Sequence, residues 1–495
     1  MRTEDPQAAA QPVSLDDQAP LDTAGQLHVN TLADSVLLLM AVTVLQRSIG
    51  FVREVFFCRW LSAEELGRWD MAFGFLMLAA PLAVVSLPGT FGRYLDRYRR
   101  TGHLRMFLRR TALFCAATAL PAALGIAAAR RQFSYLIFGT PERTHIVVLL
   151  AGGMLIVVAF NYLICLATAM RNMRWVCGIE LVSSLFFAIF GLGLLWCGSD
   201  DAGSMVVAYT AACAVCVLGG LVWLAWMWRG FPHGDGPAPH RELWSRLLPL
   251  AGWIMVINLL WNVFDVAGRY MIVHFYPGSP AEALACVGNY RSARVLPLLL
   301  ASLTVLIATA ALPHLSHDWE AGRRHRVSAR VNMLLKVWAM VLTAAGTAVL
   351  LAAPLLFRVA LQGKFSGGFD VLPWTLTYCT WFGLTMIAQN YLWCAEKARL
   401  AGLAALIGVV ANVGLNFVLL PRLGLLGAVL AATAANAAAL AMMLLLGRRF
   451  GLQVHRGTVA TVLLPLSISL GPWVACLAIA AFALEIVGSD RLLSR

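Results

Sequence analysis

Long apolar runs, each about as long as a membrane-crossing helix, recur along the whole chain and constrain its fold more than any other feature. Of the 495 residues, 60% are hydrophobic and 13% are charged, and the mean hydropathy is +0.75. Soluble domains are about 45–50% apolar, and a helix needs about 20 apolar residues to cross a bilayer. The sequence therefore predicts an all-α, polytopic membrane protein and excludes a water-soluble globule.

Turn residues and charges divide the apolar runs into about 13 predicted transmembrane helices. These helices are expected at residues 33–58, 66–90, 106–129, 145–170, 173–197, 203–228, 244–275, 282–313, 329–357, 371–395, 398–420, 424–447 and 459–487.

The same pattern predicts the organisation of the chain. Residues 1–30 contain five acidic residues and a single Arg and lack the basic region and short apolar core of a signal peptide, and they are expected to form a disordered cytoplasmic tail. Residues 229–243 contain the stretch GFPHGDGPAPH and are a predicted cytoplasmic linker. This linker separates an N-terminal six-helix half at 31–228 from a C-terminal six-helix half at 244–450, and residues 459–487 are predicted as an additional transmembrane helix.

Arginines concentrate in alternate loops, and this asymmetry predicts the orientation. Arg99 and Arg100 follow the second predicted helix, and Arg323 and Arg324 follow the eighth, whereas the loop at 198–203 has no Lys or Arg. Because basic loops stay in the cytoplasm, the N-terminus is expected to be cytoplasmic. The net charge of +13 is then a property of these loops and does not indicate a nucleic-acid partner.

Two short motifs occur twice and indicate an internal repeat. Gly67-x-Trp69-x-x-Ala72 in the second predicted helix recurs as Gly288-x-Tyr290-x-x-Ala293 in the eighth. Asn161-Tyr162-Leu163-x-Cys165 in the fourth recurs as Asn390-Tyr391-Leu392-x-Cys394 in the tenth. Each pair joins a helix to the sixth helix after it. The sequence therefore predicts two six-helix pseudo-repeats around a central cavity, plus an extra C-terminal helix.

Two segments carry a resemblance to a known family. Residues 47–54 read RSIGFVRE and are followed by Leu61-x-x-Glu64-Glu65-x-Gly67-x-Trp69, and residues 412–428 read NVGLNFVLLPRLGLLGA. With these segments the chain resembles the multidrug/oligosaccharidyl-lipid/polysaccharide (MOP) exporter superfamily. Within it, the chain is most similar to the bacterial polysaccharide-biosynthesis flippases for O-antigen or exopolysaccharide, which are related to the lipid II flippases. The resemblance covers roughly residues 33–447.

The resemblance implies a multi-pass protein of the bacterial inner membrane. It would flip an undecaprenyl-diphosphate-linked glycan across the lipid bilayer by alternating access, for synthesis of lipopolysaccharide, O-antigen or exopolysaccharide. The implied protein partners are a polysaccharide polymerase or glycosyltransferases, and no cofactor is implied. A lipid II flippase for peptidoglycan and a cation-coupled multidrug exporter stay open as alternatives. A membrane glycan polymerase, ligase or glycosyltransferase is disfavoured, because the predicted external loops are short and the sequence has no metal-ligand spacing.

Charged residues inside the predicted helices mark the candidate site. A charge at the bilayer centre costs about 2.5–3.5 kcal/mol on insertion scales, so it usually faces a cavity or a partner. Guanidinium groups hold phosphate oxygens through paired hydrogen bonds and keep their charge. The predicted diphosphate ligands are Arg47, Arg53, Arg269, Arg291 and Arg294, and the candidates for ion coupling or gating are Asp70 and Asp265. No catalytic or metal-binding residue is expected.

Simpler roles stay open for several of these charges. Arg269 follows Asp265 by one helical turn and is placed to neutralise it, and Arg53 is placed to reach the external surface beside Glu54. Asp70 and Arg291 occupy equivalent positions of the repeat with opposite charges. A pair between these two residues would act as a gate between the halves instead of a ligand set.

Overall fold

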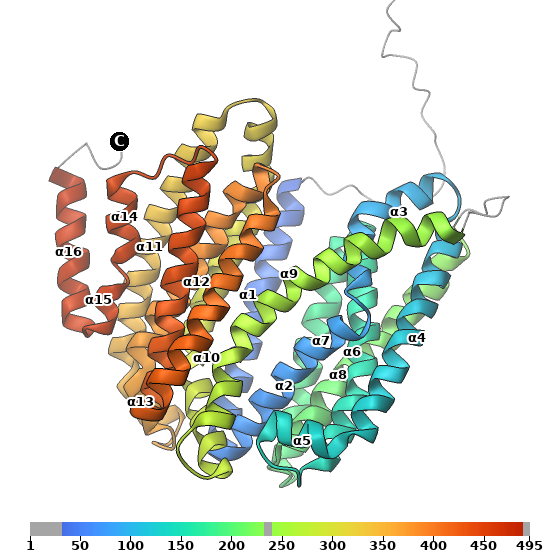
Figure 1. The fold of residues 1–495 in the computed structure, drawn as a ribbon, viewed down its shortest axis with the longest axis horizontal. Coiled ribbons are helices and arrows are strands. Elements are labelled where there is room, and N and C mark those ends of the chain that lie inside the picture. The colour runs from blue at the N-terminus through green and yellow to red at the C-terminus, as the bar shows by residue number, and fades with distance from the viewer. Residues whose placement is uncertain (1–31, 232–239, 489–495) are drawn as a thin grey trace, which may run out of the picture.

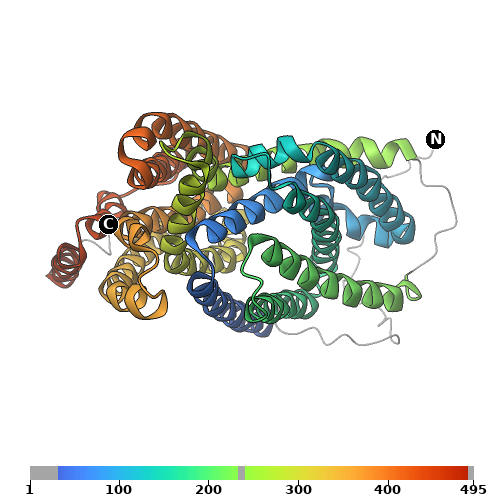
Figure 2. The same ribbon diagram turned by 90° about the horizontal axis from the view of Figure 1, so that it is seen from below.

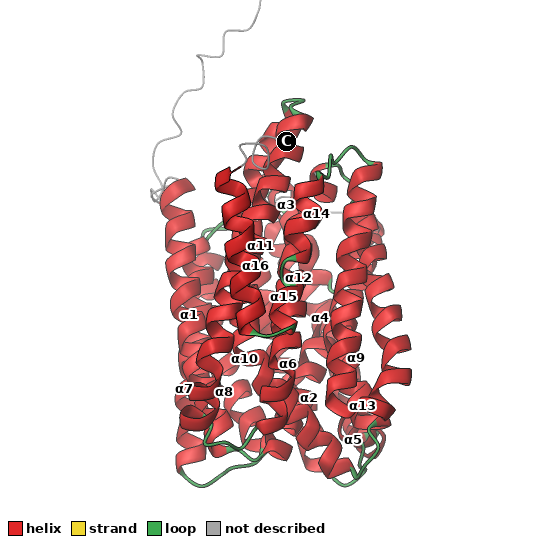
Figure 3. Ribbon diagram, turned by 90° about the vertical axis from the view of Figure 1, so that its left-hand side faces the viewer, coloured by secondary structure: helices red, strands yellow, loops and turns green. Residues whose placement is uncertain are grey.

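A computed structural model describes residues 32–231 and 240–488, and within these ranges the chain is helical with no strand (Figures 1 and 3). The elements in chain order are α1 (Leu32–Trp60), α2 (Ala63–Ala83), η1 (Leu87–Thr90), α3 (Phe91–Arg100), α4 (Leu104–Ala128), α5 (Arg130–Phe138), α6 (Thr144–Ala169), α7 (Met173–Trp196), α8 (Ala202–Trp228), α9 (His240–Phe275), α10 (Pro280–Glu320), α11 (Arg324–Leu355), η2 (Leu356–Ala360), α12 (Ser366–Cys394), α13 (Ala398–Arg449), α14 (Arg456–Leu463), α15 (Leu466–Ser469) and α16 (Pro472–Gly488). The predicted tail at 1–30 and most of the predicted linker lie outside the described residues.

The predicted all-α, polytopic fold is confirmed. Among the described residues, eight helices are long and apolar enough to cross a membrane, and α2 with η1 and α3 makes a ninth if this bent pair is one span. The long element α13 contains two helices that meet at Gly424, whose φ is +56°. A Cβ on Gly408 would lie 3.4 Å from the Cβ of Ala439, so the two parts of α13 run antiparallel, as the sequence predicts.

The helix bundle has two ends and two halves. The α1–α2 end contains the turn from α1 to α2, and the linker end contains the end of α8 and the start of α9. The N-terminal half is α1–α8, and the C-terminal half is α9–α16. Figure 1 has the linker end uppermost, and Figure 2 shows the two halves side by side with α9 and α10 where they meet.

The second predicted helix, 66–90, is broken near the linker end. Val85 and Ser86 both have a left-handed backbone, with φ of 53° and 49°. Pro88 follows at the start of η1, where its missing N–H and fixed φ prevent continuation of an α-helix. The chain resumes as α3, and the axis bends by 62° across this break. Residues 91–100, which the sequence places in the loop between the second and third predicted helices, are therefore helical.

The prediction of one transmembrane helix over 459–487 is wrong. The segment forms three helices, α14, α15 and α16. Pro465 ends the first of them, and Gly471, with φ of +112°, lies between the second and the third. The chain reverses at this glycine, so α16 returns toward the linker end (Figures 1 and 3). Hydropathy did not reveal the reversal because apolar residues continue through it.

Removal of α14, α15 and α16 is expected to destabilise the protein. The Thr458 hydroxyl donates a hydrogen bond to Asn332 Oδ1 at 2.7 Å, and Trp381 Nε1 donates to the Val462 carbonyl at 2.9 Å. A buried polar group left unsatisfied costs about 1–3 kcal/mol. We expect a chain that ends at Gly451 to unfold at a lower temperature in detergent, and Thr458→Val, a nearly isosteric change, to show part of that loss. Equal melting temperatures for Thr458→Val and the unaltered protein would contradict a structural role for this contact.

The glycines of the repeated motif lie against each other where α2 crosses α10. A Cβ on Gly67 would overlap the carbonyl group of Leu284, and a Cβ on Gly288 would overlap the carbonyl group of Ala63. Leu284 lies four residues before Gly288, and Ala63 lies four residues before Gly67. Each glycine therefore meets the same position of the other helix, as a two-fold pseudo-axis between α2 and α10 requires.

The tyrosines of the second motif also occupy similar surroundings. The Tyr162 ring packs edge-on against Phe91, with centroids 5.1 Å apart, and the Tyr391 ring packs edge-on against Trp319 at 5.5 Å. Each hydroxyl donates a hydrogen bond to a backbone carbonyl, that of Leu108 at 3.0 Å for Tyr162 and that of Phe450 at 3.2 Å for Tyr391. The motif therefore recurs in space as well as in sequence.

Candidate functional site

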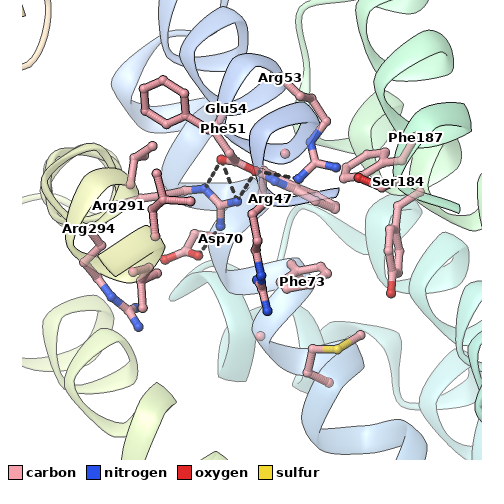
Figure 4. A pocket seen from close by; sticks show the side chains of 18 of the residues that line it. Arg47, Phe51, Arg53, Glu54, Asp70, Phe73, Ser184, Phe187, Arg291 and Arg294 are labelled. Atoms are coloured by element: carbon pink, nitrogen blue, oxygen red, sulfur yellow. Dashed lines mark hydrogen bonds and ion pairs between the residues drawn. The ribbon is translucent and has the colours of Figure 1, made fainter. Parts of the chain in front are cut away.

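A cavity of about 480 Å³ lies between the two halves. Its walls come from α1, α2, α6, α7 and α8 on one side and from α9 and α10 on the other. The structure brings every predicted site residue to this cavity: Arg47, Arg53, Asp70, Asp265, Arg269, Arg291 and Arg294. Figure 4 shows five of them, Arg47, Arg53, Asp70, Arg291 and Arg294. Two further carboxylates, Glu54 and Glu180, also line it.

These charges lie well inside the bundle. Asp70 is the eighth residue of α2, and Arg291 is the twelfth of α10, which places them about 10–17 Å along their helices at 1.5 Å per residue. Asp70, Arg269 and Arg294 are 3%, 4% and 6% exposed. Charges at such depth need counter-charges or water, and the cavity residues supply most of the counter-charges themselves.

Seven of the charged residues form an unbroken series of ion pairs, which we call the charge chain. In order, it contains Arg53, Glu54, Arg291, Asp70, Arg269, Asp265 and Arg294. Positive and negative residues alternate along it. It has four arginines and three carboxylates, so it carries one excess positive charge.

The central pairs of the charge chain join the two halves. Arg291 on α10 donates to both carboxylate oxygens of Glu54 on α1, at 2.9 and 2.8 Å, and it also pairs with Asp70 on α2. Arg269 on α9 pairs with Asp70 at 3.0 Å. In Figure 4 the Arg291 guanidinium lies between Glu54 and Asp70. The pairing of Asp70 with Arg291, one of the two roles left open by the sequence, is therefore present in this conformation.

The charge chain changes how four of the predicted phosphate ligands are interpreted. Arg53, Arg269, Arg291 and Arg294 line the cavity, but each already pairs with a carboxylate. Arg53 also lies 4.1 Å from the centre of the Phe187 ring, in the geometry of a cation–π contact. An entering anion must therefore compete with Glu54, Asp70 and Asp265 for these groups.

Arg47 and Glu180 line the cavity but stand outside the charge chain. The Arg47 side chain is exposed and projects into the cavity without an ion pair to any described residue (Figure 4). Glu180 on α7 is half-buried and likewise makes no ion pair within the described part of the chain. Sequence reasoning missed Glu180, although a single carboxylate inside an apolar span was the criterion that found Asp70 and Asp265.

Contacts between the halves close the cavity toward the α1–α2 end. There, α2 and α10 touch at Gly67 and Gly288. Lys364 Nζ donates a hydrogen bond to the Arg59 carbonyl at 2.7 Å, and His274 Nε2 lies 2.9 Å from the Leu136 carbonyl. The cavity extends the other way, past the charge chain, to residues such as Met77 and Phe160 that lie nearer the linker end. The charge chain thus lies on the closed side of the cavity.

The described residues offer no cluster of metal ligands. They contain no group of three or more His, Cys, Asp or Glu side chains that could hold a metal ion. The arrangement that is present, an arginine-rich cavity between two related halves, is suited to holding an anionic group away from bulk water.

Comparison with known proteins gives a consistent picture. The family model described as polysaccharide biosynthesis protein matches residues 32–319, and the search of curated proteins returned no match. Among solved structures, the lipid II flippase MurJ in an inward closed conformation superposes with a TM-score of 0.69 at 12% identity, covering 91% of this chain and 99% of that one.

Two transporters superpose similarly. An inward-facing multidrug resistance MATE family transporter of the MOP superfamily gives a TM-score of 0.65 at 14% identity, over 84% of this chain and 98% of that one. A MOP superfamily transporter from Pyrococcus furiosus gives 0.59 at 14% identity, over 84% and 95%. At these identities the likeness concerns the fold.

Proposed function

The chain belongs to the polysaccharide biosynthesis protein family, and from that membership we propose that it is a flippase for a lipid-diphosphate-linked oligosaccharide in the bacterial inner membrane. Its family and fold are those of MOP-type flippases and transporters. The observation that carries the substrate class is the cavity between the halves, which five arginines line. The glycan would be an undecaprenyl-diphosphate-linked precursor of lipopolysaccharide, O-antigen or exopolysaccharide, made by glycosyltransferases and used by a polymerase.

Arg47 is the proposed first ligand of the diphosphate. It faces the cavity and, unlike the four arginines of the charge chain, makes no ion pair with a described carboxylate. A phosphate held by Arg47 lies in the same cavity as the arginines of the charge chain, where it competes with their carboxylates. Bidentate guanidinium contacts replace the water that a diphosphate loses when it leaves the aqueous phase.

The proposed transport cycle alternates the open side of the cavity. If the basic linker end is cytoplasmic, the present conformation is closed toward the outside by the α2–α10 crossing and the charge chain. Phosphate binding weakens the ion pairs between the halves, the halves rock, and the cavity opens at the α1–α2 end. The lipid tail stays in the bilayer throughout.

The alternative of a cation-coupled drug exporter fits the cavity less well. Cationic drugs favour carboxylates, whereas five arginines face four carboxylates here. Lipid II carries the same diphosphate chemistry as the proposed substrate, so the binding test below applies to it as well.

Replacing Arg47 tests the ligand role. We expect Arg47→Ala to reduce glycan export at least tenfold with near-normal protein abundance, because the change breaks no ion pair between described residues. Arg47→Lys should restore export only in part, because an ammonium group lacks the planar fork of a guanidinium. Surface polysaccharide in a strain that depends on this protein is the readout. Full export by Arg47→Ala would remove Arg47 from the site.

Single-cysteine labelling tests the proposed orientation. Thr101 follows α3 at the linker end, Asp200 lies in the turn between α7 and α8 at the opposite end, and both are exposed. On a background without native cysteines, a membrane-impermeant maleimide added to intact cells with a permeable outer membrane should label Asp200→Cys and not Thr101→Cys. The reverse labelling would invert the proposed direction of transport.

A further inference from the structure

Two cavity charges are not accounted for by the charge chain, and they have opposite signs. Nine charged residues line the cavity, and seven of them are the charge chain. The remaining two are Arg47 on α1 and Glu180 on α7. A lone charge within a membrane bundle is energetically costly. Pairing of Arg47 with Glu180, or of either residue with a charged ligand, would offset this cost.

The two helices that carry these charges are neighbours. Ser184, one turn after Glu180, has its hydroxyl 3.5 Å from the carbonyl of Gln46, the residue before Arg47. Farther along, the Arg53 guanidinium of α1 lies over the Phe187 ring of α7. Both helices begin at the linker end, and side chains lean toward the start of their own helix, so Arg47 and Glu180 extend in the same direction along one wall. Arg47 is close enough to act electrostatically on the Glu180 carboxylate.

The other helices packed against α7 offer Glu180 no competing cation. Within its described span, α8 has no charged residue, and its titratable groups near the cavity are Tyr209, Cys213 and Cys216. In α6 the titratable groups are His145, at the far end of the helix, Tyr162, and Cys165. On α7 itself lie Cys177 and Arg174, and Arg174 is in the first turn of the helix and does not line the cavity. On α1, Arg53 is engaged by Glu54, which leaves Arg47 as the cavity-lining cation available to Glu180.

We propose that Glu180 couples phosphate binding at Arg47 to the uptake of one proton. This inference rests on the proposed function, because it requires an anionic substrate. Without substrate, Glu180 is ionised and its counter-charge is Arg47. When a substrate phosphate takes Arg47, Glu180 is left as a carboxylate in the cavity wall without a counter-charge. An isolated carboxylate in a poorly solvated site is neutralised by protonation instead of bearing the desolvation cost. One proton from the solvent then binds Glu180 as the phosphate–Arg47 pair forms, and no covalent bond changes.

The linkage gives the sign of the pH effect. The phosphate-bound state holds one more proton than the free state, so binding is favoured at low pH. As the pH rises, the affinity falls by up to tenfold per pH unit from this group alone. With glutamine at 180, no proton is needed and Arg47 has lost its competing carboxylate. Glu180→Gln should therefore bind phosphate more tightly than the unaltered protein at high pH and equally well at low pH.

Calorimetry can count the proton directly. The full-length protein in lipid nanodiscs is titrated with farnesyl diphosphate, a sugar-free lipid diphosphate, in two buffers of different ionisation enthalpy at one pH. Subtracting the proton count of Glu180→Gln removes the titration of the probe itself, and we expect a difference approaching one proton. Glu180→Asp should keep the proton uptake, and Glu142→Gln, which changes an exposed carboxylate between α5 and α6, should behave like the unaltered protein.

The outcomes separate this inference from the function on which it depends. If Arg47→Ala binds the probe as tightly as the unaltered protein, the proposed phosphate site is wrong. If Arg47→Ala weakens binding at least tenfold but Glu180→Gln takes up as many protons as the unaltered protein, the phosphate site stands and the coupling role of Glu180 is overturned. Sodium-dependent affinity without a difference in proton count would overturn it as well.

Discussion

Replacing Arg291 with alanine is expected to abolish transport and to lower the free energy of unfolding by about 3–5 kcal/mol, the usual cost of removing one partner from a buried ion pair. Arg291 is 15% exposed and holds two carboxylates, Glu54 and Asp70, from two helices of the other half. Without it, Glu54 keeps only Arg53 and Asp70 keeps only Arg269. Arg291→Ala should therefore lower the melting temperature and abolish export together. Arg47→Ala, in contrast, should greatly reduce export and leave the melting temperature nearly unchanged.

A second substitution distinguishes an uncompensated charge from a lost side chain. In Arg291→Ala with Glu54→Gln, one of the stranded carboxylates becomes neutral, so part of the lost stability should return. Export should stay absent, because the two ion pairs that Arg291 makes with the other half are still missing. If Arg291→Ala is as stable as the unaltered protein, the charge chain does not hold the halves together. The exchange Asp70→Arg with Arg291→Asp should not rescue function, because it places a second guanidinium beside Arg269 and a second carboxylate beside Glu54.

Valine at both crossing glycines, Gly67→Val with Gly288→Val, is expected to prevent closure at the α1–α2 end. A Cβ at either position would overlap a backbone carbonyl of the other helix, and a backbone moves aside less easily than a side chain. An overlap costing about 3 kcal/mol, within the range for overpacking, shifts the equilibrium against the closed conformation roughly hundredfold. Transport should fall by a similar factor, because each cycle must pass through this conformation.

Gly152→Val in α6 is the matched control for this double substitution. Gly152 is also a helical glycine, but a Cβ there would meet no atom within 4 Å. It should therefore change neither transport nor conformation by more than the small propensity difference between Gly and Val. Normal transport by the double-valine variant would show that the crossing need not close.

The spans and the cavity residues could be predicted from the sequence because both follow from local rules. Apolar length marks a span, and a charge inside a span must face a cavity or a partner. All seven predicted site residues accordingly line one cavity. The repeat was detectable because the same motif, Gly-x-aromatic-x-x-Ala, begins at Gly67 and at Gly288. The structure gives a packing reason for the two glycines, since only a residue without a Cβ fits where the helices cross.

The partners of those charges could not be predicted from the sequence. Asp70 and Arg291 are 221 residues apart, and their contact depends on how two helices cross. The sequence suggested Asp265 as the partner of Arg269, but Arg269 also reaches Asp70 on the other half. The reversal at Gly471 escaped notice for another reason. Hydropathy reports whether residues are apolar, and it does not report whether they belong to one helix or to two short ones.

The central claim is that the two halves rock about the cavity, and paired distances at the two ends test it most directly. Nitroxide pairs at Asp200→Cys with Arg422→Cys and at Arg174→Cys with Arg399→Cys, all exposed positions, report the α1–α2 end and the linker end respectively. Double electron–electron resonance then measures both nitroxide–nitroxide distances in the protein with Gly67 and Gly288 and in the double-valine variant. The eleven native cysteines are replaced beforehand in both proteins. The account predicts that the double-valine variant lengthens the first distance and shortens the second. Unchanged distances, or changes of the same sign at both ends, would contradict it.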